Sequence, residues 1–200
     1  MSRIQIVGED ALCCALGERL VKTFLPHSWK MARPINTRGV TNLWKNIRRY
    51  HDFAQNLFPV LCIADTDNQC VGEILRHRLP EPCGARFLLR LAVTEAESWL
   101  LADQKGFAQA FSIPLDKLPQ APDMEVDPKR LLLTLAAKSK VRSQVVQKDR
   151  LGKLKPGAEY NACLCTFVRA KWNARQAAQN SPSLARAIER LKTLRQQNQA

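Results

Sequence analysis

The stretch Pro59-Val-Leu-Cys-Ile-Ala-Asp-Thr-Asp67 is the part of the sequence that determines the fold class. It begins as an uninterrupted apolar run, which breaks abruptly at Asp65. Continuous apolarity, rather than alternation, is typical of a strand covered on both faces in a parallel sheet. Ligands of such sheets bind beyond the carboxyl ends of the strands, which is where Asp65 and Asp67 lie. We therefore predict an α/β fold with a ligand site at that edge.

Two further strand-like runs, residues 3–7 and 87–93, are also followed by acidic residues. Segments with apolar residues at helical spacing lie between the strands. The helices expected there span residues 11–24, 41–58, 68–79 and 94–103, and a short strand is expected within 28–33. Asp10 is placed to cap the first helix, and Thr94 and Glu97 have the spacing of a capping box. This alternation of elements predicts a mainly parallel sheet flanked by helices.

The last part of the chain has a different character. Residues 113–128 contain four prolines and are expected to wrap around the core without regular structure. Helices are expected at residues 128–138, 158–178 and 183–195, the last capped by Ser181 or Ser183. Residues 142–155 are expected to form a basic loop. We therefore divide the chain into an α/β core, residues 1–112, and a basic helical extension packed on it, residues 113–200.

The net charge of +13 is unevenly distributed. Residues 1–128 carry 15 Lys and Arg and 15 Asp and Glu, whereas residues 129–200 carry 16 and 3, so the whole excess lies in the extension. Such asymmetry suggests an acidic partner, with nucleic acid first and an acidic protein surface second. A solvated basic helical face explains the charge about equally well. The candidate phosphate contacts are Lys129, Arg142, Lys148, Arg150, Lys153 and Lys155. Lys129 also suits the first turn of a helix after Pro128.

The acidic residues at the three strand ends are candidate ligands of a divalent cation. They are Glu9, Asp65, Asp67, Glu95 and Glu97. Mg²⁺ (or Mn²⁺) prefers carboxylate oxygens and combines them with substrate phosphates and water. Without a cation, carboxylates that face one another raise each other's pKa. Each residue taken singly is better explained as a turn or capping residue, but the coincidence at three strand ends favours the metal site.

The same residues carry a resemblance to a known family. Glu9 after the first strand and Asp65-Thr-Asp67 after a later one resemble the acidic motif of TOPRIM domains. The stretch Leu89-Arg-Leu-Ala-Val-Thr-Glu-Ala-Glu-Ser-Trp-Leu-Leu-Ala-Asp103 is similar to the signature of a TOPRIM-like domain-of-unknown-function family (number 4276). Asp127-Pro-Lys129, Tyr160-Asn161 and Ser181-Pro-Ser-Leu184 also resemble the second half of that family. The resemblance covers most of the chain and implies a TOPRIM-like, Rossmann-like sheet.

The resemblance also implies an activity. Such proteins are similar to the nuclease half of overcoming-lysogenization-defect (OLD) enzymes, which implies metal-dependent cleavage of DNA or RNA beside a separate ABC-type ATPase in bacterial anti-phage defence. The catalytic residues implied are Glu9, Asp65, Asp67 and Glu97. Many relatives place the glutamate before the glycine, whereas this chain reads Val7-Gly8-Glu9. The acid of the first strand is therefore either Glu9 or Asp10.

Two other functions remain open at this point. The chain could be a catalytically weak interaction subunit that docks on an ATPase partner through its basic tail, or another Mg²⁺-dependent phosphotransfer or nucleotide-binding module. It contains no GxxxxGK[ST] phosphate loop, so we do not expect it to hydrolyse ATP itself. No apolar run is long enough to span a bilayer, and the sequence begins almost directly with a strand. The expected location is the cytoplasm, without membrane contact.

Overall fold

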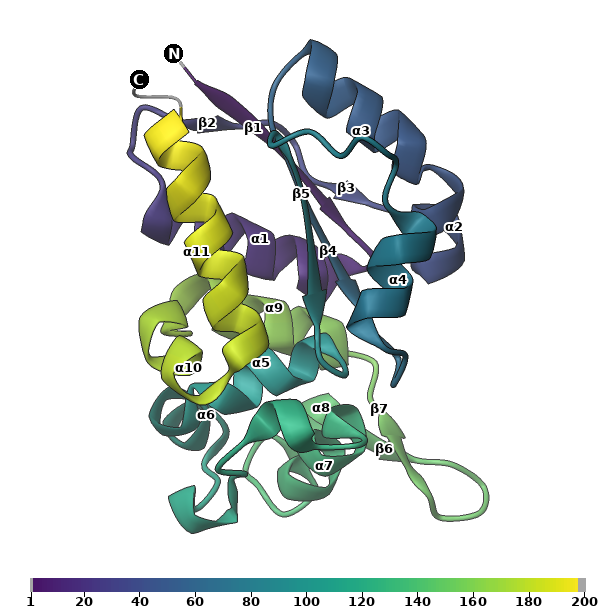
Figure 1. The fold of residues 1–200 in the computed structure, drawn as a ribbon. Coiled ribbons are helices and arrows are strands. Elements are labelled where there is room, and N and C mark those ends of the chain that lie inside the picture. Colours follow the sequence, from purple (N-terminus) through teal and green to yellow (C-terminus); the bar gives the residue numbers. More distant parts are fainter. Residues whose placement is uncertain (1, 198–200) are drawn as a thin grey trace.

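A five-stranded sheet forms the centre of the upper half of the molecule in the computed structural model, which describes residues 2–197 (Figure 1). The strands are β1 (Arg3–Gly8), β2 (Lys30–Met31), β3 (Ile35–Asn36), β4 (Val60–Asp65) and β5 (Phe87–Ala92). Their order is β2-β1-β4-β5, with β3 also pairing with β1, and every pair is parallel. The α/β class and the mainly parallel sheet are confirmed.

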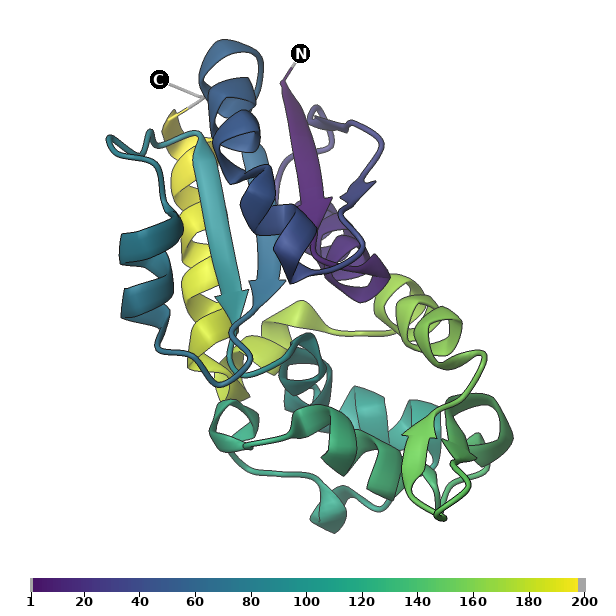
Figure 2. The ribbon, with the colours of Figure 1, turned by 90° about the vertical axis from the view of Figure 1, so that its right-hand side faces the viewer.

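Helices cover both faces of this sheet. Helices α1 (Ala11–Phe24) and α11 (Pro182–Gln197) lie on one face, and α2 (Val40–Lys45), α3 (Ile47–Asn56) and α4 (Val71–Arg78) lie on the other (Figure 2). Successive side chains of β4 enter opposite cores: Leu61 and Ile63 pack with α1, while Cys62 packs with the residues of α2 to α4. Burial on both faces explains why the run before Asp65 is continuously apolar.

The second half of the structure lies mainly beyond the carboxyl ends of the strands (Figure 1). It contains α5 (Ala96–Ala102), α6 (Gln104–Phe111), two 3-10 turns (Leu115–Lys117 and Pro122–Met124), α7 (Pro128–Ala136) and α8 (Arg142–Val145). A hairpin of β6 (Val146–Lys148) and β7 (Leu154–Pro156) follows, and then come α9 (Tyr160–Ala170) and α10 (Ala174–Asn180). The edge of the sheet that carries the acidic residues therefore faces α5, α7 and the hairpin.

Several sequence-based expectations are wrong in detail. The helix expected at 41–58 is two helices that meet at Asn46, and the one expected at 158–178 is interrupted at residues 171–173. The helix expected from residue 68 begins at Val71. Residues 142–155 are not a loop, because they form α8 and most of the β6–β7 hairpin. Asp149 organises the turn, since its side chain accepts hydrogen bonds from the backbone N–H groups of Leu151 and Lys153.

The C-terminal helices return to the sheet and share its core. Helix α11 packs against β5, and α9 packs against α1. Two buried tryptophans tie these helices to α5: the indole N–H of Trp99 donates to the Ser183 hydroxyl, and that of Trp172 donates to the backbone oxygen of Trp99. Ser181 caps α11, as expected, because its hydroxyl accepts the N–H of Leu184. Within residues 2–197, no helix is long and apolar enough to cross a membrane.

Candidate functional site

Strand pairing brings the ends of β1, β4 and β5 together. Asp65, the last residue of β4, lies beside Ala92 of β5, and the backbone N–H of Glu9 donates to Ile63. The side chains continue this contact, because Glu9 Oε2 accepts the backbone N–H of Asp65 at 3.1 Å. Asp65 Oδ1 in turn accepts the backbone N–H of Ala96 at 2.8 Å, at the start of α5. The three strand ends therefore form one acidic edge.

Gly8 determines how the acids of the first strand are presented. A Cβ atom at Gly8 would lie 2.6 Å from the backbone nitrogen of Cys14, so only glycine allows α1 to begin so close to β1. Asp10 then acts as the N-cap of α1, accepting the N–H of Cys13 at 2.8 Å. Because that cap occupies Asp10, Glu9 is the residue whose carboxylate reaches Asp65.

The loop after β4 is fixed by its backbone. Thr66 is buried, and its backbone N–H donates hydrogen bonds to the backbone oxygens of Ala92 and Thr94. Asp67 and Asn68 both have left-handed backbone angles, with φ of 47° and 63°. Asp and Asn tolerate this conformation better than most residues, and such turns are frequent at functional sites. Because β4 ends at Asp65, this turn, and not the alternation of the strand, sets the direction of the Asp67 side chain.

Glu95 and Glu97 hold α5 and α7 together. The capping box expected between Thr94 and Glu97 does not form, because Glu95 is the N-cap residue of α5. Glu95 Oε2 accepts the backbone N–H of Lys129 at 2.9 Å. Glu97 is only 4% exposed; its Oε1 accepts the Tyr160 hydroxyl at 2.8 Å and lies 3.8 Å from Lys129 Nζ. Lys129 is therefore both a first-turn residue of α7 and a cation at the acidic edge.

The carboxylates at this edge interact strongly. Burial and the charges of Glu97, Glu9 and Asp10 raise the pKa of Asp65 to about 9. Burial, with the charges of Asp67 and Asp10, also raises the pKa of Glu9. Burial opposes the charge on Lys129, but Glu97 and Glu95 outweigh it and raise the pKa of this lysine. One lysine thus faces several carboxylates, and protons or a further cation would relieve their mutual repulsion.

The donor set suits a hard divalent cation such as Mg²⁺ or Mn²⁺. Glu9, Asp65 and Asp67 supply carboxylate oxygens at one edge, which are the ligands these ions prefer. The side chains do not form a closed coordination shell: among residues 2–197, no three His, Cys, Asp or Glu side chains are arranged to hold a metal. Asp65 and Glu9 instead turn one oxygen each toward backbone N–H groups. The donor chemistry fits the ion, and binding would require these carboxylates to rotate.

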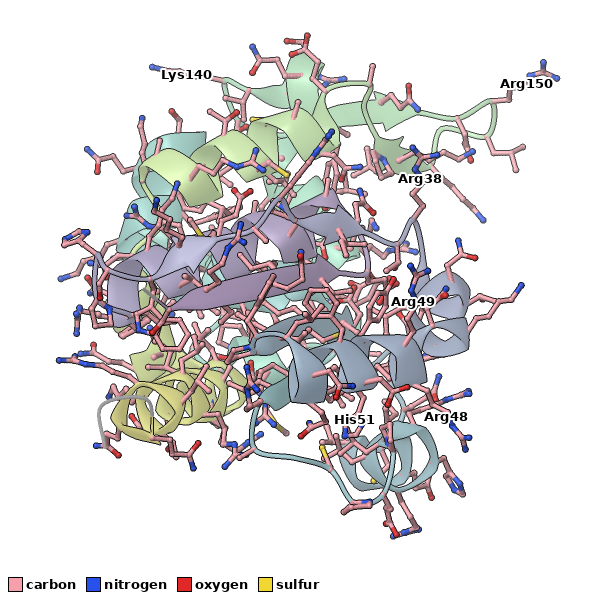
Figure 3. All side chains as sticks on the ribbon, turned by 90° about the horizontal axis from the view of Figure 1, so that it is seen from above. Arg38, Arg48, Arg49, His51, Lys140 and Arg150 are labelled. Atoms are coloured by element: carbon pink, nitrogen blue, oxygen red, sulfur yellow. The ribbon has the colours of Figure 1, made fainter. Side chains whose placement is uncertain are left out.

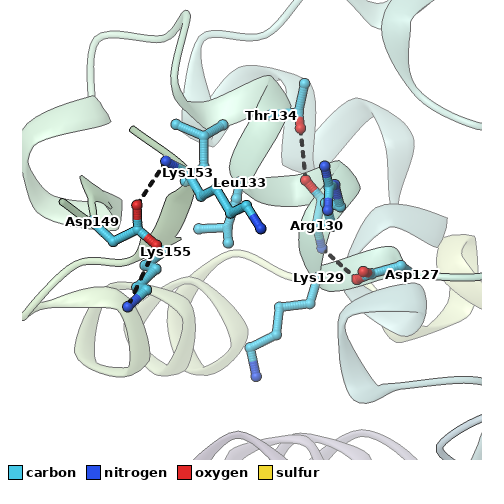
Figure 4. Close-up of a pocket in the computed structure, with 9 residues that line it drawn as sticks. Asp127, Lys129, Arg130, Leu133, Thr134, Asp149, Lys153 and Lys155 are labelled. Carbon is cyan, nitrogen blue, oxygen red and sulfur yellow. Dashed lines mark hydrogen bonds and ion pairs between the residues drawn. The ribbon is translucent and has the colours of Figure 1, made fainter. Parts of the chain in front are cut away.

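A basic pocket of about 320 Å³ lies next to the acidic edge, between α7 and the β6–β7 hairpin (Figure 4). Its charged lining consists of Lys129, Arg130, Lys153 and Lys155 with Asp127 and Asp149. Asp149 lies 3.7 Å from Lys155 Nζ, and Asp127 caps α7. Lys129 points away from Arg130 in Figure 4. Lys129 therefore belongs both to this pocket and to the acidic edge.

The other predicted basic residues lie around the hairpin. Arg142 and Lys148 line a neighbouring pocket with Val146 and Leu154. Arg150 lies in the turn of the hairpin and extends away from the molecule, on the same side of the view as Arg38, Arg48 and Arg49 (Figure 3). The structure thus brings Lys129, Lys153 and Lys155 together and leaves Arg150 apart.

Two residues of the site were not among the predicted site residues. Tyr160 reaches Glu97 across 63 positions of sequence, and Arg130 lines the basic pocket. No local pattern marks Tyr160 as a partner of an acid, because its environment depends on how α9 packs. The only sequence feature that could have indicated Arg130 is its position directly after Lys129, which was predicted to contact phosphate.

Comparisons with known proteins add no assignment: no protein-family model, no curated protein and no solved structure matches this chain.

Proposed function

We propose that this protein is a metal-dependent nuclease that hydrolyses phosphodiester bonds in DNA or RNA. The observation that carries the proposal is the convergence of Glu9, Asp65 and Glu97 from three strand ends at the edge where parallel sheets bind ligands. The adjacent basic pocket supports it, because a nuclease needs cations for the phosphate backbone beside its acidic centre.

The residues at the site divide into distinct roles. Glu9, Asp65 and Asp67 would hold Mg²⁺ or Mn²⁺, with Glu95 as a further carboxylate nearby. When bound, such an ion polarises a phosphate oxygen and lowers the pKa of bound water. Glu97 is the remaining buried carboxylate, and it is a candidate for orienting the attacking water because the Tyr160 hydroxyl holds it in place.

Lys129, Arg130, Lys153 and Lys155 would contact phosphates of the bound strand. Lys129 is the best placed to offset charge that develops on the phosphate, since its Nζ lies beside Glu97. Contacts of this kind read the backbone and carry no sequence information. We therefore expect cleavage with little sequence preference, in an anti-phage role beside an ABC-type ATPase partner as the family resemblance implies.

One observation favours a second candidate function. The acidic side chains of residues 2–197 are not arranged as a ready metal site, and Glu95 and Glu97 are engaged with α7 and α9. In this alternative the acidic edge is structural, and the protein is a weakly catalytic interaction subunit of an ATPase complex. It predicts a stable complex and no cleavage by the isolated chain.

A cleavage assay distinguishes the two functions. Plasmid DNA, single-stranded DNA and total RNA are incubated with Mg²⁺ or Mn²⁺ and wild type, Asp65→Asn or Asp116→Asn. Asp116 is an exposed acid of a 3-10 turn, so Asp116→Asn is a control with the same substitution outside the acidic edge. We expect chelator-sensitive cleavage by wild type and Asp116→Asn, and a loss of at least about a hundredfold in Asp65→Asn. Equal activity in all three proteins would exclude the acidic edge as the active site.

A further inference from the structure

Arg90 is a cation in the middle of the edge strand β5. Its neighbours at alternate positions, Leu88 and Ala92, belong to the core that contains Ile188 and Leu191 of α11. Side chains two residues apart share a face of a strand, so Arg90 leaves β5 on the side of α11. The side chain is partly buried there, in the seam between the strand and the helix.

The guanidinium of Arg90 lacks an anionic partner. Its Nε atom is buried, and no atom of the described residues forms a hydrogen bond with it. None of the ion pairs among residues 2–197 includes Arg90. Buried polar and charged groups in proteins are normally paired, so an orphan of this kind requires an explanation.

The surroundings of Arg90 add positive charge. Arg186 and Arg190, one helical turn apart on α11, are both exposed, and their charges act on Arg90. Burial and these two arginines lower the pKa of Arg90 to about 10. The acid between them in sequence, Glu189, is turned to Lys192, whose Nζ lies 2.6 Å from Glu189 Oε1. The charges near Arg90 are therefore mainly positive, and among residues 2–197 no carboxylate forms an ion pair with it.

We propose that Arg90, Arg186 and Arg190 form a docking site for an acidic side chain of a partner protein, bound along the open edge of β5. A guanidinium binds a carboxylate through two parallel hydrogen bonds, and three guanidinium groups around one position can surround such a group. The partner supplies the anion that residues 2–197 do not provide. This site is separate from the acidic edge and from the basic pocket, and it contributes no residue to either.

A polypeptide fits this site better than nucleic acid. Arg90 is recessed between a strand and a helix, and a glutamate side chain can reach such a recess with a narrow terminal group. A phosphodiester carries a nucleoside on each side and lies more easily on open lysines, such as Lys153 and Lys155 of the hairpin. The edge position of β5 also allows an extended partner segment to lie alongside the strand.

Fluorescence anisotropy with two probes tests the docking site. The probes are a labelled peptide of alternating Glu and Ala and a labelled single-stranded oligonucleotide of equal charge, both at about 0.15 M ionic strength. The variants are Arg90→Gln and the double variant Arg186→Gln/Arg190→Gln. The control is Lys22→Gln/Lys30→Gln, which removes two exposed charges of α1 and β2 and leaves the Glu189–Lys192 pair intact. Circular dichroism and thermal unfolding confirm that each variant is folded.

The expected result is peptide binding that weakens about tenfold or more in Arg90→Gln and in the Arg186→Gln/Arg190→Gln variant, and less than about twofold in the control. Oligonucleotide binding and nuclease activity should stay near wild type in these variants. The proposal is overturned if wild type does not bind the peptide, or if the control weakens peptide binding as much as the arginine variants. It is also overturned if the oligonucleotide, rather than the peptide, loses affinity when Arg90 is replaced.

Discussion

Asp65 occupies an unfavourable position for an ionised carboxylate. It is partly buried at the end of β4 and close to Glu97, Glu9 and Asp10. Two hydrogen bonds orient this residue, but neither neutralises its carboxylate. The backbone N–H of Asp65 donates to the Glu9 carboxylate, and Asp65 Oδ1 accepts the backbone N–H of Ala96. Charges of one sign held this close need a counter-charge or a proton. The pH dependence of stability therefore reports on this residue.

In metal-free protein, the free energy of unfolding should fall as the pH rises from about 4 toward 9. The folded-state pKa of Asp65 is raised from 3.8 to about 9, so between these values the folded chain binds a proton that the unfolded chain releases. That contribution is complete below the unfolded-state pKa and is lost as the pH approaches 9. We expect Asp65→Asn to flatten the dependence by several kcal/mol, because one pKa unit corresponds to about 1.4 kcal/mol. Urea unfolding at several pH values with a chelator measures it, and an unchanged slope in the variant would contradict the assignment.

Tyr160 is predicted to act by positioning Glu97. Tyr160→Phe removes the hydroxyl that donates to Glu97 Oε1 while keeping the ring that packs in the core. Removing a hydrogen-bond donor from a buried carboxylate lowers the free energy of unfolding by about 1–3 kcal/mol, so we expect moderate destabilisation. If Glu97 orients the attacking water, kcat should fall about tenfold with little change in KM. Thr166→Ala on the exposed side of α9 is the control. A stability loss without a kinetic effect would indicate a structural role only.

At the scale of the elements, apolar patterns correctly predicted the helices and strands whose side chains pack in the core. The strands β1, β4 and β5 and the helix α1 follow from such runs, and Asp10 was correctly predicted as the cap of α1. The interruption between α9 and α10 could not be predicted in this way, because Trp172 and Asn173 bind Trp99 and Asp103, some 70 residues away. The hairpin was missed because its strands are only three residues long and too short to show a clear alternation, although Asp149 and Gly152 marked its turn.

Asp103 joins two of these elements and allows a test. It is 1% exposed; its Oδ1 accepts the N–H of Gly106 in α6, and its Oδ2 accepts the N–H of Asn173 before α10 at 2.7 Å. Asp103→Ala leaves both donors unpaired, and we expect a loss of about 2–4 kcal/mol of unfolding free energy. Asp103→Asn keeps one acceptor oxygen and should lose less. Chemical denaturation measures both, and a neutral Asp103→Ala would show that α10 does not depend on this contact.

At the scale of the whole molecule, the structure places opposite charges beside each other. The acids of the N-terminal half converge at the carboxyl edge of the sheet, and the excess cations belong to residues 129–200. The chain returns through α7 and the hairpin, so Lys129 lies beside Glu97, which precedes it by many residues, and Lys153 and Lys155 line a pocket with Lys129. The composition alone indicated an acidic partner, but only the fold shows that the cations border the acidic site.

Nucleic-acid binding should therefore depend on salt, and this dependence should come from the hairpin. Each lost phosphate contact lowers the slope of log K against log salt concentration by about 1, so Lys153→Gln/Lys155→Gln should lower it by about 2. Because phosphate contacts carry no sequence information, affinity should fall equally for unrelated sequences. Lys22→Gln/Lys30→Gln is the matched control, since both lysines are exposed near the opposite edge of the sheet, where α1 ends and β2 begins. Binding is measured in the Asp65→Asn background to prevent cleavage. If both double variants lower the slope equally, binding follows net charge alone, and the basic pocket is not the place where the strand lies.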